Sequence, residues 1–186
     1  MKLRPASWLP VTGNQVFTFV TSGSRGWAQH YAQSGASFIR VGNLDHDTIA
    51  LDLNDVQCVQ PPVGAEGERT RLQAHDVLVS ITAEVGMVGL VPPGLGEAYI
   101  NQHIALARPV PGLEPRFLAW YLASEADGKR SLLSSSRGGT KSGLGLDDIR
   151  QVEIPLAPLA EQQRIADKLD AVVARVDACR DRLARV

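Results

Sequence analysis

The sequence is poor in cysteine, in long apolar runs and in net charge. Its two cysteines, Cys58 and Cys179, are widely separated and give neither a disulfide framework nor a metal-ligand spacing. No apolar run approaches the roughly 20 residues of a membrane span. The first five residues include a lysine and an arginine, but no apolar stretch of a signal peptide follows them. We therefore expect a cytoplasmic protein with reduced thiols.

Recognisable catalytic signatures are also missing. The four histidines are scattered, without the spacing of a metal site. The segment 138–142 contains the residue types of a phosphate-binding loop, but Thr140 separates the glycines from Lys141, which is the wrong order. We interpret the polar run Asn101-Gln102-His103 as a hydrogen-bonded anchor rather than as a catalytic group. The sequence therefore predicts a non-catalytic protein that needs no cofactor or metal of its own.

The charge balance constrains any nucleic-acid function. The chain carries 19 basic and 20 acidic residues, for a net charge of −1. Affinity for phosphates comes mainly from Lys and Arg, so this composition argues weakly against a general nucleic-acid binder. Binding to DNA would have to depend on a local basic surface or on charge that partners contribute.

The apolar pattern predicts one mixed α+β domain followed by an appended helix, which suits a chain of 186 residues. A proline near its start and Gly128 after its end mark a helix over 115–126. The glycine- and serine-rich segments 21–27 and 128–145 are expected to be loops, and 146–149 a short turn. The expected strands are 16–20, 36–41, 76–81, 87–91, 98–107 and 152–155.

The C-terminal segment carries the clearest periodic signal. Apolar residues recur there at alternating spacings of four and three: Ile165, Leu169, Val172, Val176, Cys179, Leu183 and Val186. This 3.5-residue repeat is typical of helices that pair in coiled coils. A helix over 158–186 would be about 43 Å long and could not bury its own apolar seam. We expect a partner helix; the alternative is a terminal helix folded back on its own domain.

Several segments, taken in order, resemble the specificity subunits of type I restriction–modification systems. The most specific is 154–165, Ile-Pro-Leu-Ala-Pro-Leu-Ala-Glu-Gln-Gln-Arg-Ile, which is followed by the heptad helix. It resembles that family's junction between a recognition domain and a spacer helix. Weaker matches are the segments 38–44, 76–86, 98–105 and 139–149.

The resemblance implies a DNA target-recognition domain over 1–157 and a spacer or dimerisation helix over 158–186. In that family each recognition domain reads one half of a bipartite double-stranded DNA target. The spacer helices pair and dock the modification subunits, which bind S-adenosylmethionine and methylate adenine, while a separate restriction motor subunit cleaves. A full subunit has two domains and two spacers, whereas this chain has one of each.

The partner of the spacer would be a second copy or a second specificity half. Two copies would read a palindromic split target, because the symmetry of the protein imposes symmetry on the site. Two other roles stay open: a truncated subunit that acts only by pairing, and a stand-alone dimeric DNA-binding regulator.

The candidate DNA contacts lie in two loops and one strand end. Arg25, set between glycines in the loop 22–27, is our first candidate for reading a base, followed by Arg40 and Asn43. Each candidate also has a structural interpretation. The aromatic residues could simply pack at the base of the loop, Arg40 could form an ion pair within the protein, and 128–145 could be a solvated surface loop. The complete set of candidates is Ser22, Ser24, Arg25, Trp27, Tyr31, Arg40, Asn43, Arg137, Thr140 and Lys141.

Overall fold

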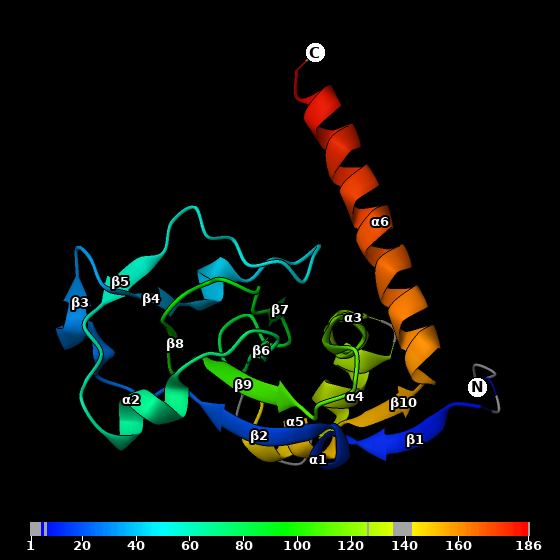
Figure 1. The fold of residues 1–186 in the computed structure, drawn as a ribbon, viewed down its shortest axis with the longest axis horizontal. Helices are drawn as coiled ribbons and strands as arrows, with labels where there is room; N and C mark the ends of the chain where they lie inside the picture. Colours follow the sequence, from blue (N-terminus) through cyan, green and yellow to red (C-terminus); the bar gives the residue numbers. More distant parts are fainter. Residues whose placement is uncertain (1–4, 6, 126, 136–142, 186) are drawn as a thin grey trace.

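The structure is a computed structural model that describes residues 5, 7–125, 127–135 and 143–185. The described chain forms two four-stranded sheets, one two-stranded ribbon, a group of short helices and one long C-terminal helix (Figure 1). This architecture confirms the expected mixed α+β fold. Within the described residues, no helix is both long and apolar enough to cross a membrane.

The central sheet has the order β2 (Phe17–Ser22), β9 (Ile104–Pro109), β6 (Val77–Ser80) and β7 (Val88–Leu90), with every neighbouring pair antiparallel. All four residues of β6 are buried, because the sheet has a core on each face. Val77 and Val79 belong to one core and Leu78 to the other, as the alternation of side chains along a strand requires. The predicted strands at 76–81 and 87–91 are confirmed, and Gly86 in their link has a φ of +87°.

Short helices cover one face of this sheet: α1 (Gly13–Val16), α3 (Pro115–Ala123), α4 (Gly128–Ser135) and α5 (Leu146–Gln151). The predicted helix at 115 is confirmed, with the proline in its first turn and the Glu114 carboxylate accepting from the Arg116 N–H. The prediction of a loop was wrong for 128–135. Burial of Leu132 against the core stabilises α4 despite its serines and glycine.

The second sheet has the order β3 (Tyr31–Ala32), β5 (Gln57–Val59), β4 (Ala36–Ile39) and β8 (Ala98–Ile100). Strand β8 is parallel to β4, and β9 follows it in the other sheet. The expected single strand over 98–107 is therefore two strands. The break lies at Asn101, whose side-chain carbonyl accepts from the His103 N–H at 3.1 Å and closes a turn.

Three short helices connect these elements: η1 (Trp27–His30), η2 (Val41–Asn43) and α2 (Ala65–Thr70). The strand expected at 16–20 starts one residue later, because Val16 is the last residue of α1.

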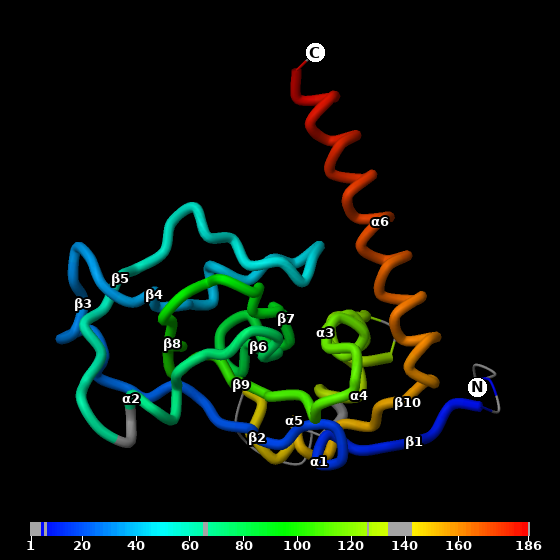
Figure 2. The backbone as a smooth tube through the Cα atoms, in the orientation of Figure 1, coloured from blue at the N-terminus to red at the C-terminus, as the bar shows by residue number. Residues whose placement is uncertain are grey.

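The ribbon joins the two ends of the globular part. Strand β1 (Leu9–Thr12) pairs antiparallel with β10 (Glu153–Leu156), which leads directly into α6 (Leu159–Leu183). Helix α6 has 25 residues, in agreement with the predicted terminal helix. The backbone trace shows α6 leaving the body at its first turns and carrying the C-terminus away from the sheets (Figure 2).

Candidate nucleic-acid interface

The loop after β2 is held in place by an arginine from another element. Arg69 of α2 donates to the side chain of Thr21, to the Ser22 carbonyl at 2.8 Å and to the Ser24 hydroxyl at 2.5 Å. A Cβ atom on Gly23 would lie 2.1 Å from the Asn101 carbonyl oxygen, so only glycine fits there. The loop base is thus fixed.

Arg25 extends from this fixed base. It is exposed, and its guanidinium forms no ion pair or hydrogen bond with any other described residue. An arginine held at its backbone and free at its head group has the properties required for contact with a base or a phosphate.

The two aromatic candidates differ in their surroundings. Trp27 is 3% exposed and stacks on Phe38, with ring centroids 5.2 Å apart and an interplanar angle of 7°. Its burial corresponds to the packing alternative, and the ring is not accessible for contact with DNA. Tyr31 is 43% exposed and packs only edge-on against Phe38, which leaves its ring accessible to a ligand.

Arg40 and Asn43 line a cavity of about 520 Å³ beside the Asn101 turn. The amide of Asn43 is buried and fully engaged: it accepts from the Arg40 N–H at 2.9 Å and donates to the carbonyls of Asp52 and Asp55 at 2.9 and 3.1 Å. In this structure Asn43 therefore holds a loop and presents no free polar atom. The half-buried Arg40 guanidinium forms no ion pair with any described residue, although Asp52 and Asp55 line the same cavity.

Asn101 and His103 also line this cavity, although neither is among the candidates that the sequence suggested. One ring nitrogen of His103 forms a hydrogen bond with the Thr82 hydroxyl, and the other forms a hydrogen bond of 2.9 Å with the Gln102 side-chain amide. These bonds agree with the interpretation of the polar run as an anchor. Asn101 links the two candidate segments, because its carbonyl contacts Gly23 and its side chain borders the Arg40 cavity.

Only part of the third candidate segment, 128–145, lies within the described residues. Arg137, Thr140 and Lys141 lie outside the described residues. Of the basic residues before them, Lys129 pairs with Glu125 at 2.6 Å, and Arg130 is exposed.

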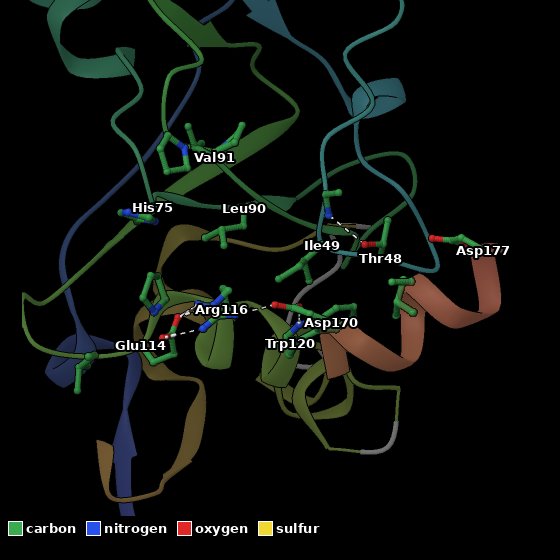
Figure 3. Close-up of a pocket in the computed structure, with 17 residues that line it drawn as sticks. Thr48, Ile49, His75, Leu90, Val91, Glu114, Arg116, Trp120, Asp170 and Asp177 are labelled. Carbon is green, nitrogen blue, oxygen red and sulfur yellow. Dashed lines mark hydrogen bonds and ion pairs between the residues drawn. The ribbon is translucent and has the colours of Figure 1, made fainter. Parts of the chain in front are cut away.

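Helix α6 is joined to the body through a network on α3 (Figure 3). Arg116 donates to Asp170 at 2.8 Å and pairs with Asp167 at 2.9 Å, and the Trp120 indole N–H donates to Asp170 at 2.7 Å. The hydrogen bond to Glu114 raises the pKa of Arg116 above its usual range, and the two aspartates add to the shift. These contacts fix the direction in which α6 leaves the domain.

A cavity of about 850 Å³ lies beyond this network, between α6, the start of α3 and the segments 48–50 and 90–93. Val173, Ala174 and Asp177 line it from the helix, and the seam residue Leu169 lines a second cavity with Trp120 and Ala123, so the body side of α6 adjoins the heptad seam.

The heptad seam is exposed over most of its length. Ile165 packs against the core, whereas Leu169, Val172, Val176 and Leu183 are 37, 48, 44 and 77% exposed, and Cys179 is exposed too. The buried residues of α6 are Gln162 and Ala166, both in its first two turns; Gln162 precedes Leu169 by seven residues and so occupies the same heptad position. Within the described residues, the seam from Val172 onward is therefore left exposed by the protein's own domain, whereas Leu169 borders a cavity on that domain.

The described chain thus combines a mixed α+β body, an exposed arginine on an anchored loop and a projecting heptad helix. Residues 61–186 match the family described as type I restriction modification DNA specificity domain. The chain belongs to this family, whose related subunits are non-catalytic and determine DNA specificity.

Individual relatives agree with this assignment. The chain is 26% identical over 149 residues to the type I restriction enzyme EcoBI specificity subunit of Escherichia coli, which covers 78% of this chain and 30% of that protein. The HsdS subunit from Thermoanaerobacter tengcongensis is 25% identical with a TM-score of 0.65, covering 94% of this chain and 39% of that one. The type I S subunit from M. genitalium, 16% identical, has a TM-score of 0.60 over 96% of this chain and 42% of its own. The chain thus spans less than half the length of these relatives.

Proposed function

We propose that residues 1–157 read one half of a bipartite DNA target, and that the helix of 158–186 positions this domain and docks modification subunits. The observation that carries the proposal is the loop at Arg25, where hydrogen bonds from Arg69 hold the neighbouring Ser22 and Ser24, and the Arg25 guanidinium has no partner among the described residues. The anchored start of α6 supports the second half, since a spacer must transmit a fixed distance and direction. Catalysis would belong to the partner subunits.

The candidate contacts divide into two kinds. Arg25 is proposed to read a base edge in the major groove, with Tyr31 and Arg40 beside it. Ser22, Ser24, Arg137, Thr140 and Lys141 are proposed to contact phosphates, which position the duplex without reading its sequence. Trp27 and Asn43 support the first group from inside the domain, because both are buried.

Arg25→Ala tests the base contact. If Arg25 reads a base, its loss costs about 1–3 kcal/mol of binding free energy at one base pair and relaxes the preference there. Affinity for each single-base variant of the target, measured in the complex with the modification subunit, gives this profile. Arg164→Ala, at an exposed position of α6, is the matched control. Equal weakening of every sequence would show that Arg25 contacts phosphate instead.

The spacer role predicts partners on α6. The proposed partners are modification subunits that carry S-adenosylmethionine, the restriction motor subunit of the full complex, and a second copy or second specificity half that pairs with the seam. Replacing Leu169 and Val176 by Asp should abolish pairing, whereas Asp at the exposed Ala171 and Ala178 should preserve it. Sedimentation of the mixed subunits measures both; pairing that survives in the seam variant contradicts this role.

The exposed seam also supports a second candidate, a specificity fragment that acts only by pairing with a longer subunit. It predicts complex formation without any DNA preference. Methylation patterns with and without the Arg25 side chain separate the two candidates.

A further inference from the structure

A row of basic side chains runs beside the exposed seam. Lys168, Arg175 and Arg182 follow one another at heptad spacing, about 10 Å apart along the helix. Each of them directly precedes a seam residue (Leu169, Val176, Leu183), so the row borders the seam along its length. All three are exposed. We call these three residues the basic row.

No carboxylate of the described residues compensates the charge of the basic row. None of the three forms an ion pair with another described residue, whereas Arg164 pairs with Glu161 and Arg180 with both Asp47 and Asp177. The positions three and four residues away from Lys168, Arg175 and Arg182 hold no acidic residue at all. In a helix these positions supply the stabilising partners of a charged side chain. Among the described residues, the basic row is therefore free to pair with charges from outside this chain.

A second copy of α6 cannot supply them. In coiled coils the residues that flank the seam pair across the interface and select the partner. If two copies of α6 ran parallel, the basic row would face Val173 and Arg180 of the other copy. If they ran antiparallel, the row would face itself. Both arrangements bring positive charges together and neither provides a carboxylate.

DNA does not explain the arrangement either. A phosphate backbone would compensate the basic row but would leave the adjacent Leu169, Val172 and Val176 exposed to water. An amphipathic helix covers both features at once, its apolar side on the seam and its charged flank on the row.

We infer that α6 pairs with a non-identical helix whose apolar heptad is flanked by Asp or Glu at the positions facing Lys168, Arg175 and Arg182. This inference rests on the spacer role proposed above and specifies the chemistry of the partner. It favours a second, different specificity segment over a second copy of this chain, because like charges at the flank act against self-pairing.

Two synthetic heptad peptides test the inference. They share one apolar seam and carry Glu in one peptide and Lys in the other at every flanking position. Labelled peptides are titrated with the whole chain and followed by fluorescence anisotropy. We expect the Glu peptide to bind at least about tenfold more tightly than the Lys peptide, since three ion pairs replace three repulsions.

Matched variants identify the source of the preference. The triple variant K168E, R175E and R182E should reverse it, and the exposed positions of the three side chains make the change compatible with folding. Leu169→Asp with Val176→Asp should abolish binding of both peptides. Circular dichroism of each variant should match that of the parent chain.

Four results would overturn the inference: equal affinity for the two peptides, no binding of either, a stable homodimer that the triple variant does not strengthen, or a triple variant that loses duplex DNA affinity while keeping its peptide preference. Each concerns α6 alone. The base-pair profile of Arg25 measures the recognition domain separately, so failure of the partner chemistry and failure of the proposed function give different results.

Discussion

Gln162 holds the first turns of α6 on the domain. Its side chain is 2% exposed; its amide nitrogen donates to the Ala157 carbonyl at 2.7 Å, and its carbonyl oxygen accepts from the Glu114 N–H at 3.0 Å. The Gln162→Ala substitution removes both bonds and leaves a buried carbonyl and a backbone N–H without this partner. Each uncompensated group costs about 1–3 kcal/mol, so the free energy of unfolding should fall by about 2–6 kcal/mol.

Urea denaturation, followed by far-UV circular dichroism and tryptophan fluorescence, measures this change. Trp8 and Trp120 contact α6 through Glu161 and Asp170, so their emission reports its detachment. Gln163→Ala is the control, because this neighbour is exposed and should change stability by no more than about 0.5 kcal/mol. If the two variants unfold at the same urea concentration, Gln162 does not anchor the helix and the reasoning is refuted.

Three further substitutions test the interior of the domain. Asp76→Ala removes a buried carboxylate that accepts two hydrogen bonds at 2.8 Å from the partly buried Arg108. The loss should cost about 3–5 kcal/mol in thermal or urea denaturation, against almost no change for the exposed Asp181→Ala. Trp27→Ala should cost about 3–5 kcal/mol of stability, and a variant that lost DNA affinity at unchanged stability would contradict the packing role. Burial and the hydrogen bond to Glu97 raise the pKa of Tyr99 to about 12. The tyrosine of the unfolded chain therefore loses its proton at lower pH than that of the folded chain, and the free energy of unfolding should fall between pH 10 and about 12. A fall that is just as steep in Tyr99→Phe would contradict this.

The sequence predicted best those elements whose signal is local. The buried strands β6 and β7 are uninterrupted apolar runs, and α6 shows a regular heptad, so both were recognisable from pattern alone. Helix α4 was missed because its serines and glycine favour a loop locally. Leu132, buried between α3, α5 and the sheet, stabilises the helix through tertiary contacts that no local pattern contains.

The candidate site shows the same division. Arg25 could be selected from its glycine-rich loop, but the hydrogen bonds that Arg69 donates to Ser22 and Ser24 of that loop, from some 45 residues further along the chain, could not be predicted. The break between β8 and β9 is a turn at Asn101, closed by a side-chain hydrogen bond from His103 and a backbone hydrogen bond from Ile104. This turn joins the Arg25 loop to the Arg40 cavity. Burial of Trp27 and Asn43 follows from packing between segments distant in sequence.

The most direct test of the proposed function is a map of methylated adenines. The chain would be co-expressed with its modification subunit in a host that lacks other adenine methylation, and the methylated sites would be mapped by sequencing the genome. The proposal predicts methylation at a defined motif, with Arg25→Ala relaxing one base position of that motif. A complex that forms but methylates at no defined motif would contradict DNA reading by this domain.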